Sequence, residues 1–236
     1  LGLFCFVTMP MLALLMRPRP PAAAAAAAPT RRAAIAPVPS TRPFGLGMNQ
    51  AQGLLCVAGV ACCVAMAMPQ VHIVAYCGDL GYGPARGAEM LAAMMGFGIV
   101  SRIASGFIAD RIGSLQTLLA GSMLQGVALF LYLWFDGLIS LYVISALFGL
   151  FQGGIVPMYA IIVREHFSPS ETGIRLGVVL MATLIGMALG GWMSGAIFDL
   201  TGSYRAAFAN GIAWNVLNAG VAALLLWRSG RRLAPA

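Results

Sequence analysis

The chain of 236 residues is 60% hydrophobic and 9% charged, and its net charge of +7 arises because arginines outnumber acidic residues. Soluble domains are about 45–50% apolar and about 25% charged, so this composition excludes a water-soluble globular fold, which needs more polar surface. The sequence therefore predicts an integral membrane protein.

The first predicted element is an apolar run at residues 1–16, LGLFCFVTMPMLALLM. Basic residues follow this run instead of preceding it, which argues against a signal peptide. We interpret the run as the tail of a truncated transmembrane helix, so we expect the chain to be a fragment of a longer protein. Residues 17–50 are then a cytoplasmic linker rich in Pro, Ala and Arg, a composition that cannot form a core.

Six further apolar stretches are each long enough to cross a membrane. A bilayer core requires about 20 apolar residues in helical form. The predicted spans cover residues 53–77, 90–109, 114–135, 137–163, 176–198 and 206–227. They predict a six-helix transmembrane domain over residues 51–228, followed by a cytoplasmic tail at 229–236.

Arginines are distributed unevenly between the two faces that six alternating spans define. One face receives eleven of them and the other receives only Arg86 and Arg205. Cytoplasmic loops carry the excess of basic residues, so the eleven-arginine face and the C-terminus are predicted to be cytoplasmic, in a bacterial inner membrane. The basic charge then reports orientation and implies no nucleic-acid partner.

Small residues recur at four-residue spacing on two of the predicted spans. The fourth span carries Gly149 and Gly153, and the fifth carries Gly186 and Gly190. Such rows let helix backbones approach closely where lipid supplies no hydrophobic driving force. These glycines are therefore predicted to pack helices against one another.

Two prolines occupy corresponding places in the first and fourth spans, which cross the membrane in opposite directions. Pro69 and Pro157 each lie in the later part of their span. This placement is expected for two inverted three-helix repeats, although two independent helix kinks give the same pattern.

A charged motif, GFIADRIG at residues 106–113, ends the second span. Its pattern of Gly106, Asp110, Arg111 and Gly113 resembles the loop signature of the major facilitator superfamily, in the copy between the second and third helices of the C-terminal half. The basic pair that usually follows the last glycine is absent here. The resemblance implies an all-α membrane fold in which this chain is the six-helix C-terminal bundle and the N-terminal six-helix half is missing.

The resemblance also gives the motif a role. In this superfamily its acid lies near the start of the eleventh helix, for which the sequence offers Ser168 as N-cap, Pro169 at the first helical position and Glu171 at the third. A carboxylate at that helix end gains about 0.3–1 kcal/mol from the helix dipole. Asp110 and Arg111 are then a conformational latch between the flanking glycines, and a solvated turn is the alternative.

Within the superfamily, two runs narrow the resemblance. FGLFQGGIVPMYAIIVREHF at 148–167 and FDLTGSYRAAF at 198–208 are similar to bacterial relatives of the monocarboxylate porters and the oxalate:formate antiporter. The resemblance implies secondary active transport of a small organic anion, a mono- or dicarboxylate, by alternating access with proton coupling or exchange. A transporter of a drug or neutral metabolite and a non-transporting membrane scaffold remain the alternatives.

Arg102 is the one charge inside a predicted span. A central arginine costs about 2.5–3.5 kcal/mol on insertion scales, and no acidic residue lies three or four positions away to neutralise it. It either binds an anionic substrate, pairs with an acid on the missing half, or extends its side chain toward the cytoplasm. Arg102 resembles an arginine on the eighth helix of monocarboxylate porters, but Gly98 replaces the aspartate that commonly lies four residues earlier, which puts its proton-coupling role in doubt.

Three further polar residues are candidates to contact the substrate. His72 follows Pro69 on a helix that lines the central path in this superfamily, and it either titrates during transport or is a neutral core histidine. Gln152 and Tyr159 line a cavity or bridge helices. The sequence contains no catalytic triad, metal-ligand cluster or phosphate-binding loop, so we expect neither an enzyme nor a cofactor.

Overall fold

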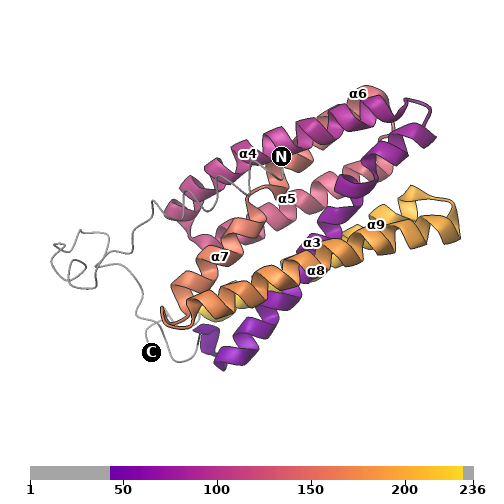
Figure 1. Cartoon of the computed structure of the whole chain (residues 1–236). Helices are drawn as coiled ribbons and strands as arrows, with labels where there is room; N and C mark the ends of the chain where they lie inside the picture. The colour runs from indigo at the N-terminus through magenta and orange to yellow at the C-terminus, as the bar shows by residue number, and fades with distance from the viewer. Residues whose placement is uncertain (1–42, 231–236) are drawn as a thin grey trace, which may run out of the picture. The chain divides into compact units, whose positions relative to one another are not determined.

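The computed structural model describes residues 43–230, and every regular element among them is helical (Figure 1). Six segments are long and apolar enough to cross a membrane, and α6 and α7 together form one of them. The elements are the 3-10 turn η2 (Pro43–Gly45) and the helices α3 (Met48–Asp79), α4 (Pro84–Ile112), α5 (Ser114–Trp134), α6 (Leu138–Gln152), α7 (Ile155–His166), α8 (Thr172–Thr201) and α9 (Tyr204–Gly230). The predicted all-α fold with six spans is confirmed. The predicted partial helix at 1–16, the linker up to residue 42 and the tail beyond residue 230 lie outside the described residues.

The helices extend past several of the apolar stretches that predicted them. α3 starts at Met48, before the predicted domain start at residue 51, because the Gln50 side chain accepts a hydrogen bond from the Gly47 N–H at 3.2 Å. This contact satisfies one of the donors that a helix start leaves open. At the other end of the domain, α9 continues to Gly230.

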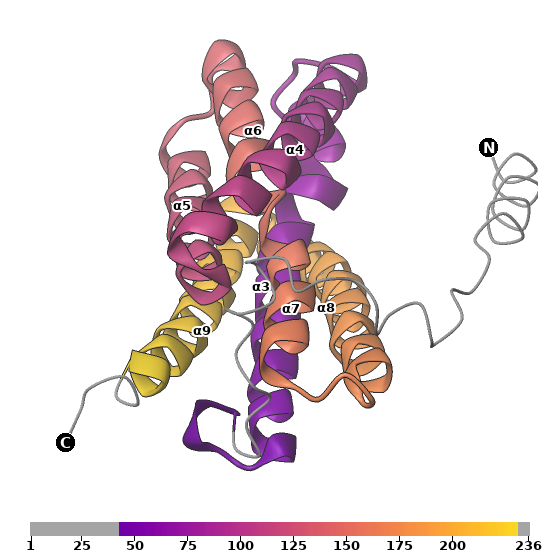
Figure 2. The ribbon, with the colours of Figure 1, turned by 90° about the vertical axis from the view of Figure 1, so that its left-hand side faces the viewer.

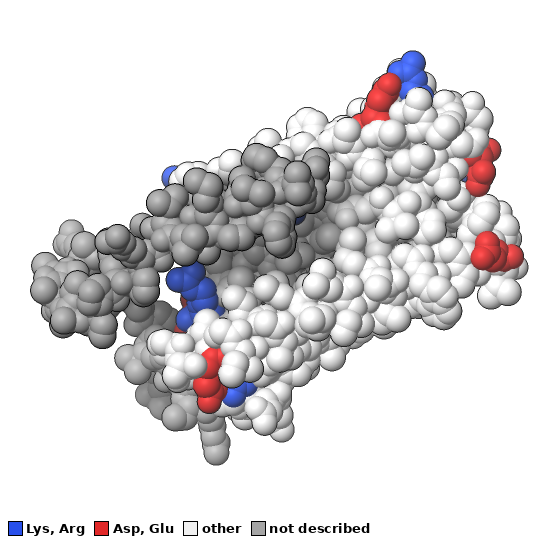
Figure 3. All heavy atoms as spheres, viewed as in Figure 1, with Lys and Arg blue, Asp and Glu red and all other residues white. Residues whose placement is uncertain are grey.

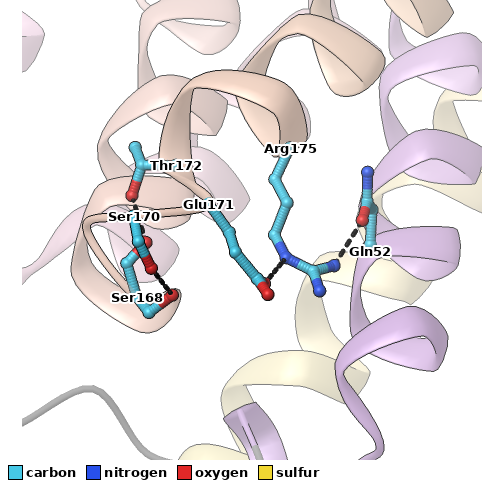
Figure 4. A network of polar contacts seen from close by, with 6 residues as sticks. All are labelled: Gln52, Ser168, Ser170, Glu171, Thr172 and Arg175. Atoms are coloured by element: carbon cyan, nitrogen blue, oxygen red, sulfur yellow. Dashed lines mark hydrogen bonds and ion pairs between the residues drawn. The ribbon is translucent and has the colours of Figure 1, made fainter.

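The start of α8 differs from the sequence prediction. Ser168 does not cap the helix, because its hydroxyl lies 3.2 Å from the Ser170 hydroxyl and its carbonyl accepts the N–H groups of Glu171 and Thr172 (Figure 4). Residues 168–171 therefore form a turn, and α8 begins one turn later than predicted, at Thr172. The Thr172 hydroxyl strengthens this turn by donating to the Ser168 carbonyl at 2.8 Å.

α3 runs through the middle of the bundle (Figure 2). It packs mainly on α8 and α9, while α6 packs on α4 and α5. The first span of each group of three thus packs on the second and third spans of the other group, as two inverted three-helix repeats require. Every residue of α3 from 61 to 69 is buried, so α3 supplies much of the core.

Small residues bring α8 onto α3. A Cβ atom added at Gly186 would lie 2.6 Å from the Val60 carbonyl oxygen, and one at Gly190 would lie 2.6 Å from the Val64 carbonyl oxygen. Both distances are shorter than real Cβ contacts allow. The close approach of these two helices therefore requires glycine at both positions.

The same relation holds between α6 and α4. A Cβ atom at Gly149 would overlap the Met94 backbone, and one at Gly153 would overlap the Gly98 backbone. The two glycine rows thus lie at equivalent helix pairs of the two repeats. Backbone contact of this kind favours association of helices that lipid does not drive together.

Charged side chains gather at the two ends of the bundle on the face that Figure 3 shows. The helix ends at one side carry four of the described arginines, and the opposite ends carry four of the described acids. The arginines are Arg111, Arg164, Arg175 and Arg228, and the acids are Asp79, Glu89, Asp136 and Asp199. Arg102 is different, because it lies within α4, about three turns before the helix ends.

Candidate functional site

A cavity of about 240 Å³ lies among α3, α4, the junction of α6 and α7, and α8. Its polar lining includes Gln70, Arg102 and Gln152, and Arg102 is the one charged side chain among the described residues that line it. Two larger hollows, of about 300 and 510 Å³, have no charged residue in their described lining. Of these three hollows, the 240 Å³ cavity is therefore the one whose described lining offers a charged group to a ligand.

α4 aims Arg102 into the cavity by its helical register. Met95, Gly98 and Arg102 are spaced at i, i+3 and i+7, which places them on one face of the helix. Gly98 is buried where α4 meets α6, and as a glycine it places no side chain between Met95 and Arg102 at this position. Arg102 itself is exposed in this domain and can reach a ligand.

The junction of α6 and α7 is a break in a membrane-spanning helix. α6 ends at Gln152 and α7 begins at Ile155, with Gly153 and Gly154 between them. Gly153 and Gly154 keep right-handed helical φ and ψ, so the interruption is the loss of the helical hydrogen bond at the Gly154 N–H, and such a polar group at membrane depth is tolerated only where protein satisfies it or where it lines a cavity. Both conditions hold here, because the Gly154 N–H donates to Ser101 Oγ at 3.0 Å and Gly153 lines the cavity.

The break presents Gln152 to a partner on α3. Gln70 Nε2 donates to Gln152 Oε1 at 2.9 Å, and the pair joins α3 to the end of α6 at the cavity wall. An amide has two donors and an acceptor with two lone pairs, so this one bond leaves each glutamine able to bind a ligand. Gln70 was missed by the sequence interpretation, and its place directly after Pro69 within a span was the available signal.

The structure does not bring His72 and Tyr159 together with Arg102. His72 Nε2 lies 3.0 Å from the Gly191 carbonyl oxygen on α8. Tyr159 is fully buried and donates to Asn218 Oδ1 at 2.7 Å. Of the four predicted substrate contacts, Arg102 and Gln152 share the cavity, whereas His72 and Tyr159 are not among its lining residues.

Tyr159 belongs to a buried polar network that joins α5, α7 and α9. Asn218 Nδ2 donates to Ser122 Oγ at 2.8 Å, and Asn215 Nδ2 donates to the Ser122 carbonyl at 3.0 Å. The Ser122 hydroxyl donates in turn to the Leu118 carbonyl at 2.9 Å. Polar contacts of this kind hold membrane helices in register, which gives Tyr159 a packing role.

The motif at 106–113 forms the tight link between α4 and α5. Gly113 has a φ of +95°, which favours glycine, and its N–H donates to the Ala109 carbonyl at 2.9 Å. Asp110 and Arg111 are exposed in the last turn of α4. Ser114, which stands where the superfamily signature has a basic residue, donates instead to a Glu165 carboxylate oxygen at the end of α7.

The first turn of α8 contacts α3 through Arg175. Arg175 Nε lies 2.7 Å from Glu171 Oε2, and its Nη1 donates to Gln52 Oε1 at 2.5 Å (Figure 4). The Arg175 guanidinium also lies 5.0 Å from the centroid of the Phe167 ring. Arg175 thus connects the start of α8 to α3.

Comparison with known proteins identifies similar chains. The family model described as Major Facilitator Superfamily matches residues 117–235. Monocarboxylate transporter 13 of Rattus norvegicus is 30% identical over 156 residues, which are 65% of this chain and 36% of that protein. The multidrug export protein EmrB of Haemophilus influenzae is 26% identical over 131 residues, which are 52% of this chain and 25% of that protein.

A solved structure shares the fold. The peptide transporter POT in complex with alafosfalin superposes with a TM-score of 0.68 at 18% identity, over 79% of this chain and 40% of that one. At this identity the match concerns the fold alone. The chain thus spans less than half the length of each of these three proteins.

Proposed function

Because the chain belongs to the major facilitator superfamily, we propose that its six helices form one half of a secondary active transporter for a small organic anion. The substrate crosses the membrane by alternating access between two six-helix halves. The 240 Å³ cavity is the contribution of this half to the substrate site. The share of its relatives that the chain covers supports a second half as its partner.

Arg102 carries this proposal. Inserting a cation into an apolar span costs free energy, and binding of an anion to that cation offsets part of this cost. A guanidinium binds a carboxylate through two parallel hydrogen bonds, and Gln70 and Gln152 line the same cavity as further hydrogen-bonding groups. The similarity to a monocarboxylate transporter supports a carboxylate as the anion.

Coupling to protons needs a titratable group near the substrate. The described lining of the cavity contains neither a carboxylate nor a histidine, and Gly98 occupies the place of the aspartate found in the porters. Proton coupling therefore requires a group from the second half or the substrate's own carboxyl group. Exchange of one anion for another requires neither of these.

The distribution of charged residues between the two ends supports one orientation of the bundle in the membrane. We place the end that carries Arg111, Arg164, Arg175 and Arg228 on the cytoplasmic side of a bacterial inner membrane, with the C-terminus there as well. GFIADRIG then lies on the cytoplasmic side, where a conformational latch acts on the inward opening.

Export of a neutral or drug-like compound is the second candidate function. The similarity to EmrB and the apolar part of the cavity lining favour it. Arg102 separates the two candidates, because a neutral substrate gains little from a guanidinium. A non-transporting scaffold is the remaining alternative, and it would have no ligand for the cavity to bind.

Uptake by proteoliposomes tests the proposed function. The protein of the full reading frame is reconstituted, and saturable uptake of labelled carboxylates is compared between the wild type, Arg102→Ala and the control Arg205→Ala, which removes an exposed arginine at the opposite end of the bundle. We expect Arg102→Ala to lose uptake and the control to retain it.

Two results contradict the proposal. One is uptake by Arg102→Ala that equals the wild type at matched protein levels. The other is failure of Arg102→Ala to accumulate in the membrane together with rescue by an acid-to-neutral change in the second half, which makes the arginine a structural ion-pair partner.

A further inference from the structure

The cavity is lined by methionine side chains as well as by polar groups. Met66 of α3, Met95 of α4 and Met187 of α8 line it from three different helices, and we name these residues the methionine wall. Met95 is 44% exposed and Met187 is half-buried, so their thioethers are accessible to a ligand, whereas Met66 is 7% exposed. Leu184 and Val156 extend the same apolar surface.

Thioether side chains recognise a particular class of molecule. They are unbranched and polarizable, they adapt to irregular apolar shapes, and they make favourable contacts with aromatic rings. They offer no donor to a carboxylate, so an anionic group placed against them loses its hydration without replacement. Thr183, which lines the same side, already donates its hydroxyl to the Leu180 carbonyl at 2.7 Å.

The spacing along α4 sets the size of the molecule that reaches both parts of the cavity. Met95 and Arg102 are two turns apart on one helix face, which corresponds to about 10 Å of axial rise. The arginine side chain leans toward the N-terminus of its helix and shortens this gap. An arylalkyl carboxylate held by Arg102 spans more of this distance than a two-carbon carboxylate and contacts Met95 over a larger apolar area.

We infer that the methionine wall receives the apolar body of the transported anion, which is therefore a monocarboxylate with an aromatic or branched alkyl group. The inference rests on the proposed function, because Arg102 holds the carboxylate in both. A dicarboxylate is disfavoured, because the described lining holds one cation and the second charge would lie against thioethers.

Paired substrates test this inference. Proteoliposomes containing the protein of the full reading frame are assayed with labelled 3-phenylpropionate and labelled acetate, and with unlabelled succinate as a competitor. The variants are Met95→Ala, Met187→Ala and Arg102→Ala. Met181→Ala serves as the matched control, since Met181 is on α8, is 58% exposed and does not line the cavity.

The expected result is a change in substrate preference. Each wall variant loses three terminal side-chain atoms and should raise the half-saturating concentration of 3-phenylpropionate about tenfold. The value for acetate and the behaviour of the control should stay near wild type, Met95→Leu should restore most of the loss, and succinate should compete no better than acetate.

Other results separate the two proposals. If Arg102→Ala stops uptake of both carboxylates but the wall variants leave the preference for 3-phenylpropionate over acetate unchanged, the inference is overturned and the proposed function stands. Strong competition by succinate, or no saturable uptake of 3-phenylpropionate by the wild type, also overturns the inference. If Arg102→Ala transports both carboxylates like the wild type, the proposed function itself fails.

Discussion

Gly190→Ala is expected to destabilise the domain by forcing α8 away from α3. The new Cβ atom would lie 2.6 Å from the Val64 carbonyl oxygen and 2.8 Å from the Ala67 Cβ. Ordinary contacts begin near 3.4 Å, so the two backbones must separate by about 0.8 Å at a contact made by backbone atoms, which cannot rotate away. Overpacking of this kind costs about 1–3 kcal/mol in free energy of unfolding, against at most about 1 kcal/mol gained because alanine has the higher helix propensity.

Thermal unfolding in detergent measures this loss. A thiol-reactive fluorophore reports unfolding when Cys62 and Cys63, both buried, become accessible. A net loss of about 1–2 kcal/mol lowers the midpoint by about 2–8 °C for a domain of this size. Gly177→Ala is the matched control, because it lies on the same helix with nothing within 4 Å of its added Cβ. Equal midpoints for the two variants would refute the close packing of α8 on α3.

Two further changes separate packing from transport. Tyr159→Phe removes the donor to Asn218, so it should lower the free energy of unfolding by about 0.6–1.7 kcal/mol while uptake per protein stays near wild type; loss of uptake without loss of stability would instead make Tyr159 a substrate contact. Asp110→Asn removes a charge at nearly constant size, so it should reduce uptake at normal membrane abundance if GFIADRIG is a latch. Unchanged uptake by Asp110→Asn would leave the motif as a turn.

The spans and the helix contacts were predictable because they depend on local pattern. Apolar runs of membrane length identify the six spans wherever they lie in the fold. Glycines at four-residue spacing, such as Gly186 and Gly190, indicate a helix face that approaches another backbone. The pattern did not say which backbone, and the structure assigns them to α3.

The site was only partly predictable, because it combines residues whose meeting depends on helix register. Arg102 stood out in the sequence since its charge is costly in an apolar span. Gln70 and Gln152 are separated by 82 positions, and their hydrogen bond joins α3 to the end of α6, which sequence spacing does not indicate. The methionine wall was not predictable for a similar reason. Methionine is an ordinary residue of apolar spans, and only the folded arrangement brings methionines from three helices to one cavity.

Local capping chemistry explains the error at α8. Ser168 followed by Glu171 matches the pattern of a capping box, but the Ser168 hydroxyl contacts Ser170, and Glu171 pairs with Arg175. Arg175 also reaches Gln52 on α3, a contact that sequence spacing cannot indicate. The helix start is therefore set by a network that includes a neighbouring helix.

Equilibrium binding to Arg102 variants tests the central claim most directly. Labelled 3-phenylpropionate is titrated into the purified protein of the full reading frame, with wild type, Arg102→Lys and Arg102→Ala compared at matched folded fraction. A lysine keeps the charge but loses the planar fork, so Arg102→Lys should bind about tenfold or more weakly, and Arg102→Ala should show no saturable binding. Equal affinity in all three proteins would contradict the assignment of Arg102 as the group that holds the carboxylate.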